Sequence, residues 1–210
     1  MTIKHRPLRA AVVFIAAVVV ALTGCSDEGN LGPPTPTGAT DIGGPPMTST
    51  PAPPPGWNLK EVVPQSQQQA QDTVLGYLQR TIDALPPGTA LDATRYAGAG
   101  QNSYCDDNDS SPNGPMRFHT IGDLKLPPGG DPVKVVASVG DIWRGWGWHV
   151  FERDGFRKPN QFGYAPDGYR LQIGVPGREG YPPSIQASSP CFPGEIANDD
   201  VPFPAVISSG

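Results

Sequence analysis

The sequence predicts an α+β domain in which two helices pack on one face of a mainly antiparallel sheet. Two segments carry apolar residues at intervals of three and four positions, the spacing of an amphipathic helix. After the second segment the apolar spacing changes to two, which indicates strands. A Pro-Asp-Gly turn then separates two alternating runs, as in a hairpin. Helices combined with hairpin strands favour a layered α+β architecture.

Each predicted helix has its own boundary signals. The first runs from about 65 to 85 and stops at the Pro-Pro-Gly of 86–88, because proline cannot continue a helix. Its apolar stripe consists of Ala70, Val74, Leu75, Leu78, Ile82 and Leu85. The second begins at Asp131, an N-cap followed by Pro132 at the first helical position, and ends near Gly145. Its apolar face consists of Val135, Val136, Val139, Ile142, Trp143 and Trp146.

The strands are predicted from alternation of apolar and polar residues. The alternating runs are 148–153, 161–164 and 168–174. Two weaker strands are expected before the second helix, at about 89–96 and 115–124. The C-terminal 30 residues carry many prolines, so we expect them to be coil held in place by Cys191.

The N-terminus has the features of a secretory signal. Residues 1–9 contain three basic residues and no acid, and residues 10–22 are apolar without interruption. An apolar helix of that length rises about 20 Å, whereas the hydrocarbon core of a bilayer is about 30 Å thick. The apolar run is therefore too short to span a membrane, and a cleaved signal is predicted.

The tetrapeptide Leu22-Thr23-Gly24-Cys25 resembles the lipobox of bacterial lipoproteins. By that resemblance the signal is cut before Cys25, which becomes the first mature residue and carries a diacylglyceryl group and palmitate-type acyl chains. Two or three acyl chains anchor a protein stably, where one would not. The alternative is an ordinary secretory signal with a cysteine there by chance.

The chain divides into three parts. Residues 1–24 are the predicted signal peptide, and 25–56 comprise the lipidated cysteine and a linker in which nine of the residues from 26 to 56 are proline. Such a composition cannot bury enough apolar surface to fold, so a disordered tether is expected, either unmodified or O-glycosylated. Residues 57–210 are long enough for one domain with a real core.

Charge limits the partners. The whole chain has 15 basic and 20 acidic residues, a net charge of −5. Loss of the signal would remove basic residues only, which makes the mature chain more acidic still. The balance argues against nucleic acid and against a basic patch that grips anionic headgroups, so membrane attachment is expected to come from the lipid on Cys25 alone.

The three cysteines predict one disulfide. Once Cys25 is assigned to the lipid, Cys105 and Cys191 remain, in a compartment that permits disulfides. A bridge between them closes a long loop, which the chain-entropy model values at roughly 4–5 kcal/mol. The alternatives are two buried free thiols or a metal pair, although no Cys-x-x-Cys or histidine cluster supports a metal.

No catalytic motif stands out. Ser138 lies in a Val-x-Ser-x-Gly segment, but a nucleophile elbow needs glycine in place of Val136, and the segment falls inside a predicted helix. His119 and His149 each lie in a predicted strand, where a surface or core-edge role is favoured over that of a catalytic base. The sequence does not show either histidine meeting a nucleophile and an acid.

The acidic stretch 106–114 is the best candidate metal site. Asp107 and Asp109 alternate and could present oxygens to calcium. An EF-hand loop starting at Asp107 would need glycine at position six and glutamate at twelve, where Pro112 and Phe118 stand. The alternative is a polar turn beside the disulfide, and the sequence as a whole predicts no metal and no cofactor.

Three tryptophans have two interpretations. Trp143 and Trp146 share one face of the second predicted helix, and Trp148 follows closely. As core residues they fix that helix to the sheet; as a partly open platform they would stack a sugar ring or hold an acyl chain. Core is the favoured interpretation.

The combination of features resembles the small Lpp-class lipoproteins of mycobacteria and related actinobacteria. The shared layout is a lipobox, a Pro-rich tether, an amphipathic helix, a first cysteine, a second helix running into a strand, a Gly-Tyr-x-Leu strand and a late second cysteine. The resemblance implies a cell-envelope location and an α+β fold. Because these families largely lack a known activity, it implies no catalytic residues.

The functional expectation is a non-enzymatic protein on the outer face of the plasma membrane, which binds an envelope glycan, lipid or protein. One alternative is a hydrolase of cell-wall or lipid esters, which requires a converging Ser/Cys–His–Asp arrangement. Another is a structural or host-facing surface antigen, which predicts no pocket.

Overall fold

A computed structural model describes residues 50–108, 111–197 and 201–209. The predicted signal peptide 1–24, the lipidation site Cys25 and most of the predicted tether lie outside the described residues. Within the described part of the chain, none of the helices has both the length and the apolar character that crossing a bilayer requires.

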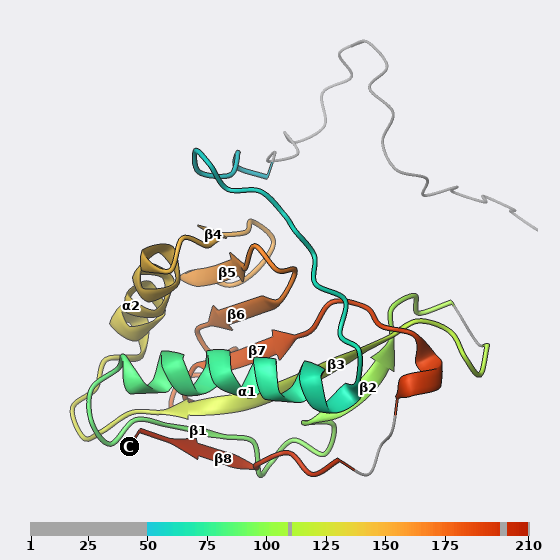
Figure 1. Ribbon diagram of the computed structural model, residues 1–210. Coiled ribbons are helices and arrows are strands. Elements are labelled where there is room, and N and C mark those ends of the chain that lie inside the picture. Colours follow the sequence, from blue (N-terminus) through green and yellow to red (C-terminus); the bar gives the residue numbers. More distant parts are fainter. Residues whose placement is uncertain (1–49, 109–110, 198–200, 210) are drawn as a thin grey trace, which may run out of the picture. The chain divides into compact units, whose positions relative to one another are not determined.

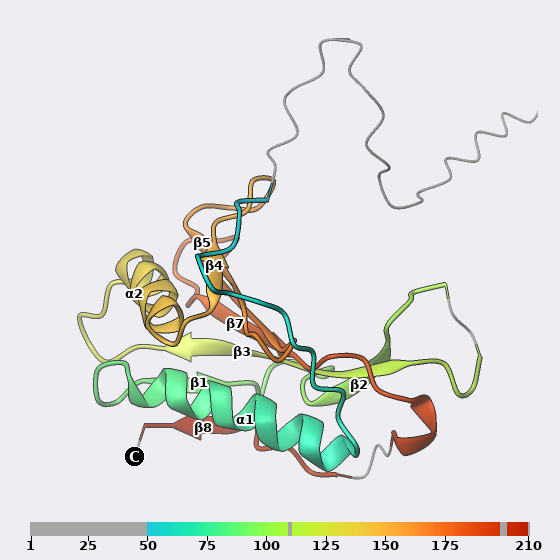
Figure 2. The same cartoon turned by 45° about the horizontal axis from the view of Figure 1, so that its top comes forward.

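The described chain forms two helices and one antiparallel sheet, as the sequence predicts (Figure 1). The elements in chain order are α1 (Gln67–Asp83), β1 (Ala90–Asp92), β2 (Gln101–Tyr104), β3 (Met116–Lys125), α2 (Pro132–Gly145), β4 (His149–Phe151), β5 (Asn160–Tyr164), β6 (Arg170–Gly174), β7 (Ser184–Ser188), a 3-10 turn at Gly194–Ile196 and β8 (Val206–Ser208). The sheet order is β4-β5-β6-β7-β3-β1-β8, and β2 pairs with β3. Both helices pack against the sheet, α1 over its β8 end and α2 over its β4 end (Figure 2).

Helix α1 forms where its cap and its apolar stripe predict it. The Ser66 hydroxyl accepts a hydrogen bond from the backbone N–H of Gln69 at 3.1 Å, which caps the first turn. Its stripe residues Ala70, Val74, Leu78 and Ile82 are fully buried. Full burial of three such large side chains supplies several kcal/mol, far more than helix propensity alone.

Helix α2 is capped by Asp131, whose carboxylate accepts from the N–H groups of Val133 and Lys134. On its inner face Trp143 is fully buried, and its indole N–H donates to the Thr81 hydroxyl of α1 at 3.1 Å. A Cβ at Gly163 would lie 2.7 Å from the Trp143 ring, so only glycine fits there. The two helices and the sheet therefore meet at one indole.

The predicted hairpin is confirmed as β5 and β6, which pair along their full length. Gly168 at its turn has a φ of 94°, the left-handed conformation that glycine tolerates. The predicted strand at 148–153 is observed as the shorter β4. The weaker predictions at 89–96 and 115–124 correspond to β1 and β3.

The expectation of coil for the C-terminal residues is wrong. Strand β7 lies between β6 and β3 in the middle of the sheet, and β8 forms one edge beside β1. Strand β2 was also not expected. Prolines 182, 183 and 190 flank β7 without entering it, so its backbone N–H groups stay free to pair on both sides.

The disulfide between Cys105 and Cys191 is formed, as predicted, with the two Cα atoms 6.2 Å apart. It joins the segment after β2 to the segment after β7. Beside it the backbones of Met116 and Phe192 exchange hydrogen bonds of 2.9 and 2.7 Å. The bond is typical of proteins outside the reducing cytoplasm.

Candidate functional site

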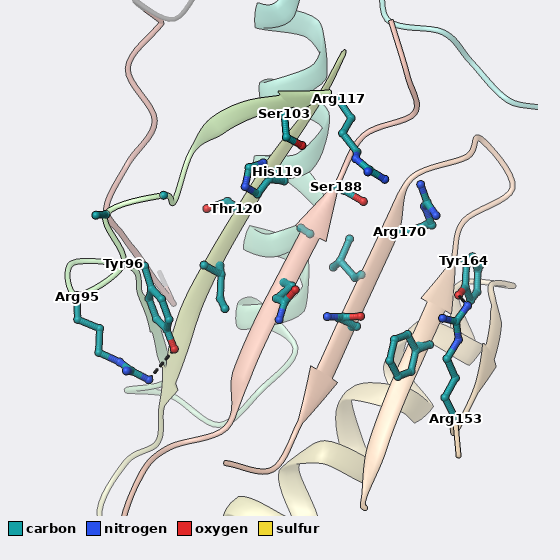
Figure 3. Close-up of a pocket in the computed structure, with 18 residues that line it drawn as sticks. Arg95, Tyr96, Ser103, Arg117, His119, Thr120, Arg153, Tyr164, Arg170 and Ser188 are labelled. Atoms are coloured by element: carbon teal, nitrogen blue, oxygen red, sulfur yellow. Dashed lines mark hydrogen bonds between the residues drawn. The ribbon is translucent and has the colours of Figure 1, made fainter. Parts of the chain in front are cut away.

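The sheet face that points away from the helices is hollowed into a groove of about 740 Å³ (Figure 3). Strands β2, β3, β7, β6 and β5 supply its floor, and the segment between β1 and β2 supplies one wall. Its volume lies in the range of small-molecule sites. No motif in the sequence indicated this groove.

Strand register places the polar floor of the groove in one row. His119 of β3 is the Cα partner of Ser188 on β7, Ser188 is the partner of Arg170 on β6, and Arg170 is the partner of Tyr164 on β5. Neighbouring strands are about 4.8 Å apart, so this row spans roughly 14 Å. Two residues along the strands a second row follows, made of Ile121, Gln186, Gln172 and Phe162.

The groove is strongly cationic. Four arginines and one histidine line it: Arg95, Arg117, His119, Arg153 and Arg170. Within the described part of the chain, none of the lining residues is acidic. The sequence argument against a basic patch is therefore wrong for this face, because a net charge of −5 averages over charges that the fold has separated.

Arg95 is neutralised by a buried acid beside the groove. Its guanidinium contacts the Asp123 carboxylate at 2.7 Å, and Tyr96 and Lys125 donate to the same carboxylate. Burial alone would raise the pKa of Asp123, but these hydrogen bonds outweigh it and lower the pKa to about 2. Burial and the bond to Asp123 raise the pKa of Tyr96 to about 12. Arg95 and Tyr96, held by Asp123, thus form one wall of the groove, and the charge of Arg95 is compensated there.

The other three arginines face no carboxylate among the described residues. Among the described residues, the Arg117 guanidinium donates only to the backbone carbonyls of Tyr104 and Cys105, at 3.4 and 3.3 Å. Arg153 lies 4.6 Å over the Phe162 ring and donates to the Tyr164 hydroxyl. The Arg170 side chain is exposed and makes no hydrogen bond or ion pair with a described residue. Three guanidinium charges thus remain open for an anion.

Among the described residues, His119 finds no partners that complete a catalytic triad. Ser188 is its cross-strand neighbour, but a triad also needs an acid that orients the imidazole. Asp123 lies four residues further along β3, roughly 13 Å away, and is engaged by Arg95. Burial, aided by the charge of Arg117, lowers the pKa of His119, and the hydrogen bond to the backbone of Gln101 opposes this. The hydrolase alternative finds no support at this residue.

The other candidate nucleophile and base are apart from the groove. Ser138 is exposed on α2, where its hydroxyl donates to the Lys134 carbonyl. His149 is buried beside the rings of Trp57 and Phe151, at centroid distances of 5.5 and 4.8 Å. It borders a second hollow of about 730 Å³ between β4 and residues 51–58.

The tryptophan platform is wrong for two of its three residues. Trp143 is fully buried and Trp148 is 4% exposed, so both rings belong to the core. Trp146 is half-buried, and the Arg80 guanidinium covers its ring at 4.2 Å. The Trp143 ring packs against Gly163 of β5 and lies 6.1 Å from the Trp148 ring, so these two residues fix α2 to the sheet.

The acidic stretch shows no metal-binding arrangement in its described part. Asp107 is exposed, and Asp109 lies outside the described residues. Asp106 accepts from the N–H of Asn108, as in an Asx turn, and Phe118 is fully buried in the core. Among the residues with described placement, no group of three or more His, Cys, Asp or Glu residues could hold a metal ion.

The groove arginines were missed because they come from different strands. A weak signal exists, since Arg117 and Arg170 each occupy an outward position of an alternating strand.

Comparison of the chain with protein-family models, with curated proteins and with solved structures finds no match.

Proposed function

We propose that this protein is a lipid-anchored extracytoplasmic binding protein whose groove takes an anionic ligand. One observation carries the ligand class: three open guanidinium groups share a groove without an acidic lining residue among those described. In a partly enclosed groove these charges reinforce each other, and each guanidinium can donate two parallel hydrogen bonds to an oxyanion.

The anchor and the address come from the sequence. The lipobox-like Leu22–Cys25 and the proline-rich linker support a domain held outside the plasma membrane by acyl chains on Cys25. The disulfide agrees with an oxidising compartment. Mass spectrometry of the native protein tests the anchor, since a free thiol at Cys25 would contradict it, as would a Cys25→Ala protein that stays in the detergent phase.

A polyanion without phosphate tests the binding function. We expect the full-length protein in detergent to bind sucrose octasulfate but not sucrose in calorimetric titration, with an affinity that falls as salt rises. Arg117→Gln and Arg170→Gln should each weaken binding about tenfold, the loss expected for one charge-assisted hydrogen bond.

The matched control is Lys134→Gln, which removes one positive charge from an 85% exposed side chain on α2. Its affinity should equal that of the unchanged protein. Equal losses of affinity in all three variants would mean that only the net charge of the protein matters. If the unchanged protein does not bind sucrose octasulfate, the proposal of an anionic ligand is refuted. A surface antigen without a ligand, the remaining alternative, predicts that second result.

A further inference from the structure

Two arginines flank one serine on the floor of the groove. Arg170 is the cross-strand partner of Ser188, and Arg117 lies one diagonal step away on β3, two residues before Ser188's partner His119. Diagonal neighbours are about 7–8 Å apart at Cα, within reach of an arginine side chain. Figure 3 shows Arg117 extended from β3 towards Ser188, with Arg170 on the far side of Ser188.

The donors at this point suit a tetrahedral oxyanion. The planar guanidinium groups of Arg117 and Arg170 and the hydroxyl of Ser188 belong to three different strands. Together they can donate to three oxygens that do not lie in one plane. A carboxylate has only two oxygens, in one plane with its carbon. Among the described residues that line the groove, the cations other than His119 are four arginines and no lysine, and arginine prefers bidentate contact with phosphate.

The next row of the floor suits hydroxyl groups. Gln172 and Gln186 are cross-strand partners about 7 Å further along β6 and β7. Their side-chain amides make no hydrogen bond with a described residue, and each amide can both donate and accept. Ile121 and Phe162 lie at the two ends of this row and offer apolar contact to a ring face.

From these two rows, and resting on the anion-binding function proposed above, we propose that the ligand is a phosphorylated polyol or sugar. Its phosphoryl group lies between Arg117, Ser188 and Arg170, and its hydroxyl groups lie on Gln172 and Gln186. The same chemistry occurs in a soluble sugar phosphate and in the headgroup of a phosphoinositide-type lipid.

Four small probes separate the parts of this proposal in calorimetric titration of the full-length protein in detergent. Inositol 1-phosphate carries both features, inorganic phosphate lacks the polyol, inositol lacks the anion, and glucuronate replaces phosphate by carboxylate. We expect inositol 1-phosphate to bind at least about tenfold more tightly than each of the others, since each lacks at least one charge-assisted or paired hydrogen bond.

Substitutions test which part of the ligand each row of the groove floor binds. Arg117→Lys keeps the positive charge but cannot donate two parallel hydrogen bonds, so it should weaken inositol 1-phosphate binding about tenfold. Gln172→Leu combined with Gln186→Leu should bring inositol 1-phosphate down to the affinity of inorganic phosphate, while inorganic phosphate itself binds as before. Lys134→Gln is the control, and a thermal melt of each variant confirms that it is folded.

Vesicles distinguish the source of the ligand. Binding to vesicles with phosphatidylinositol, but not to those with phosphatidylglycerol of equal charge, assigns the site to a lipid headgroup. Binding to inositol 1-phosphate without vesicle binding assigns it to a soluble sugar phosphate.

Two results would overturn the proposal. If sucrose octasulfate binds but glucuronate equals inositol 1-phosphate, the phosphorylated polyol is wrong and the anionic ligand stands. If neither sucrose octasulfate nor any of the small anions binds, both proposals fail.

Discussion

The helix-covered face and the open face of the sheet are built from alternate residues of the same strands, yet they carry opposite chemistry. On β6 Leu171 and Ile173 are buried under the helices, whereas Arg170 and Gln172 point into the groove. Strands β3 and β7 alternate in the same way. The difference predicts that stability and the proposed ligand binding can be changed separately, by single substitutions one residue apart.

The largest effect is expected on the helix-covered face. Trp143→Ala removes a fully buried ring that contacts Gly163 and hydrogen-bonds Thr81. It should lower the free energy of unfolding by about 3–5 kcal/mol, because a large cavity remains. Urea denaturation measures this, with Trp146→Ala as the half-buried comparison, for which a clearly smaller loss is expected. Equal losses would mean that the two rings pack alike.

The second effect concerns Asp123, where the open face also carries stability. Asp123→Asn weakens the bonds from Arg95, Tyr96 and Lys125 and should cost about 1–3 kcal/mol at pH 7. Because the folded pKa of Asp123 is lowered to about 2, its stabilisation is present above pH 4 and is lost as the pH falls towards 2.

Urea denaturation of both proteins from pH 7 to pH 2 measures this difference. The difference in unfolding free energy between the unchanged protein and Asp123→Asn should become small near pH 2. A gap that is constant with pH would contradict the role of the charge.

The third effect is a pH dependence of binding. Burial and Arg117 lower the pKa of free His119, and an anion held between Arg117 and Arg170 would raise it again. Binding is then coupled to proton uptake, so affinity should rise a few-fold as the pH falls from 7.5 to 5.5. Sucrose octasulfate is the proper probe because its own charge does not change in that interval.

His119→Gln should remove this pH dependence while the protein still binds sucrose octasulfate at pH 7.5. A pH dependence that survives in His119→Gln would assign it to another group.

The smallest effect is expected for stability in Arg170→Gln. Its side chain is exposed and makes no ion pair or hydrogen bond with a described residue, so the unfolding free energy should change by no more than about 0.5 kcal/mol. The same variant should lose anion affinity. A large loss of stability would show that the two faces are not separable.

Local signals in the sequence determined both helices and the hairpin. Caps such as Ser66 and Asp131, apolar stripes and the Pro-Asp-Gly turn act within a few residues, where the chain's own geometry decides the outcome. The cysteine pairing followed by elimination instead: with Cys25 assigned to the lipid, Cys105 and Cys191 had one pairing to form.

Only the tertiary structure decided the place of β7 and the existence of the groove. Strand β7 is short and polar on one side, and it becomes a central strand because β3 and β6 pair with it from distant parts of the chain. Arg117, Arg153 and Arg170 likewise share a groove only through strand register, which no single segment contains. Non-local pairing also buries Asp123 against Arg95, which compensates the charge of its carboxylate. The groove is therefore cationic although the net charge of the whole chain is −5.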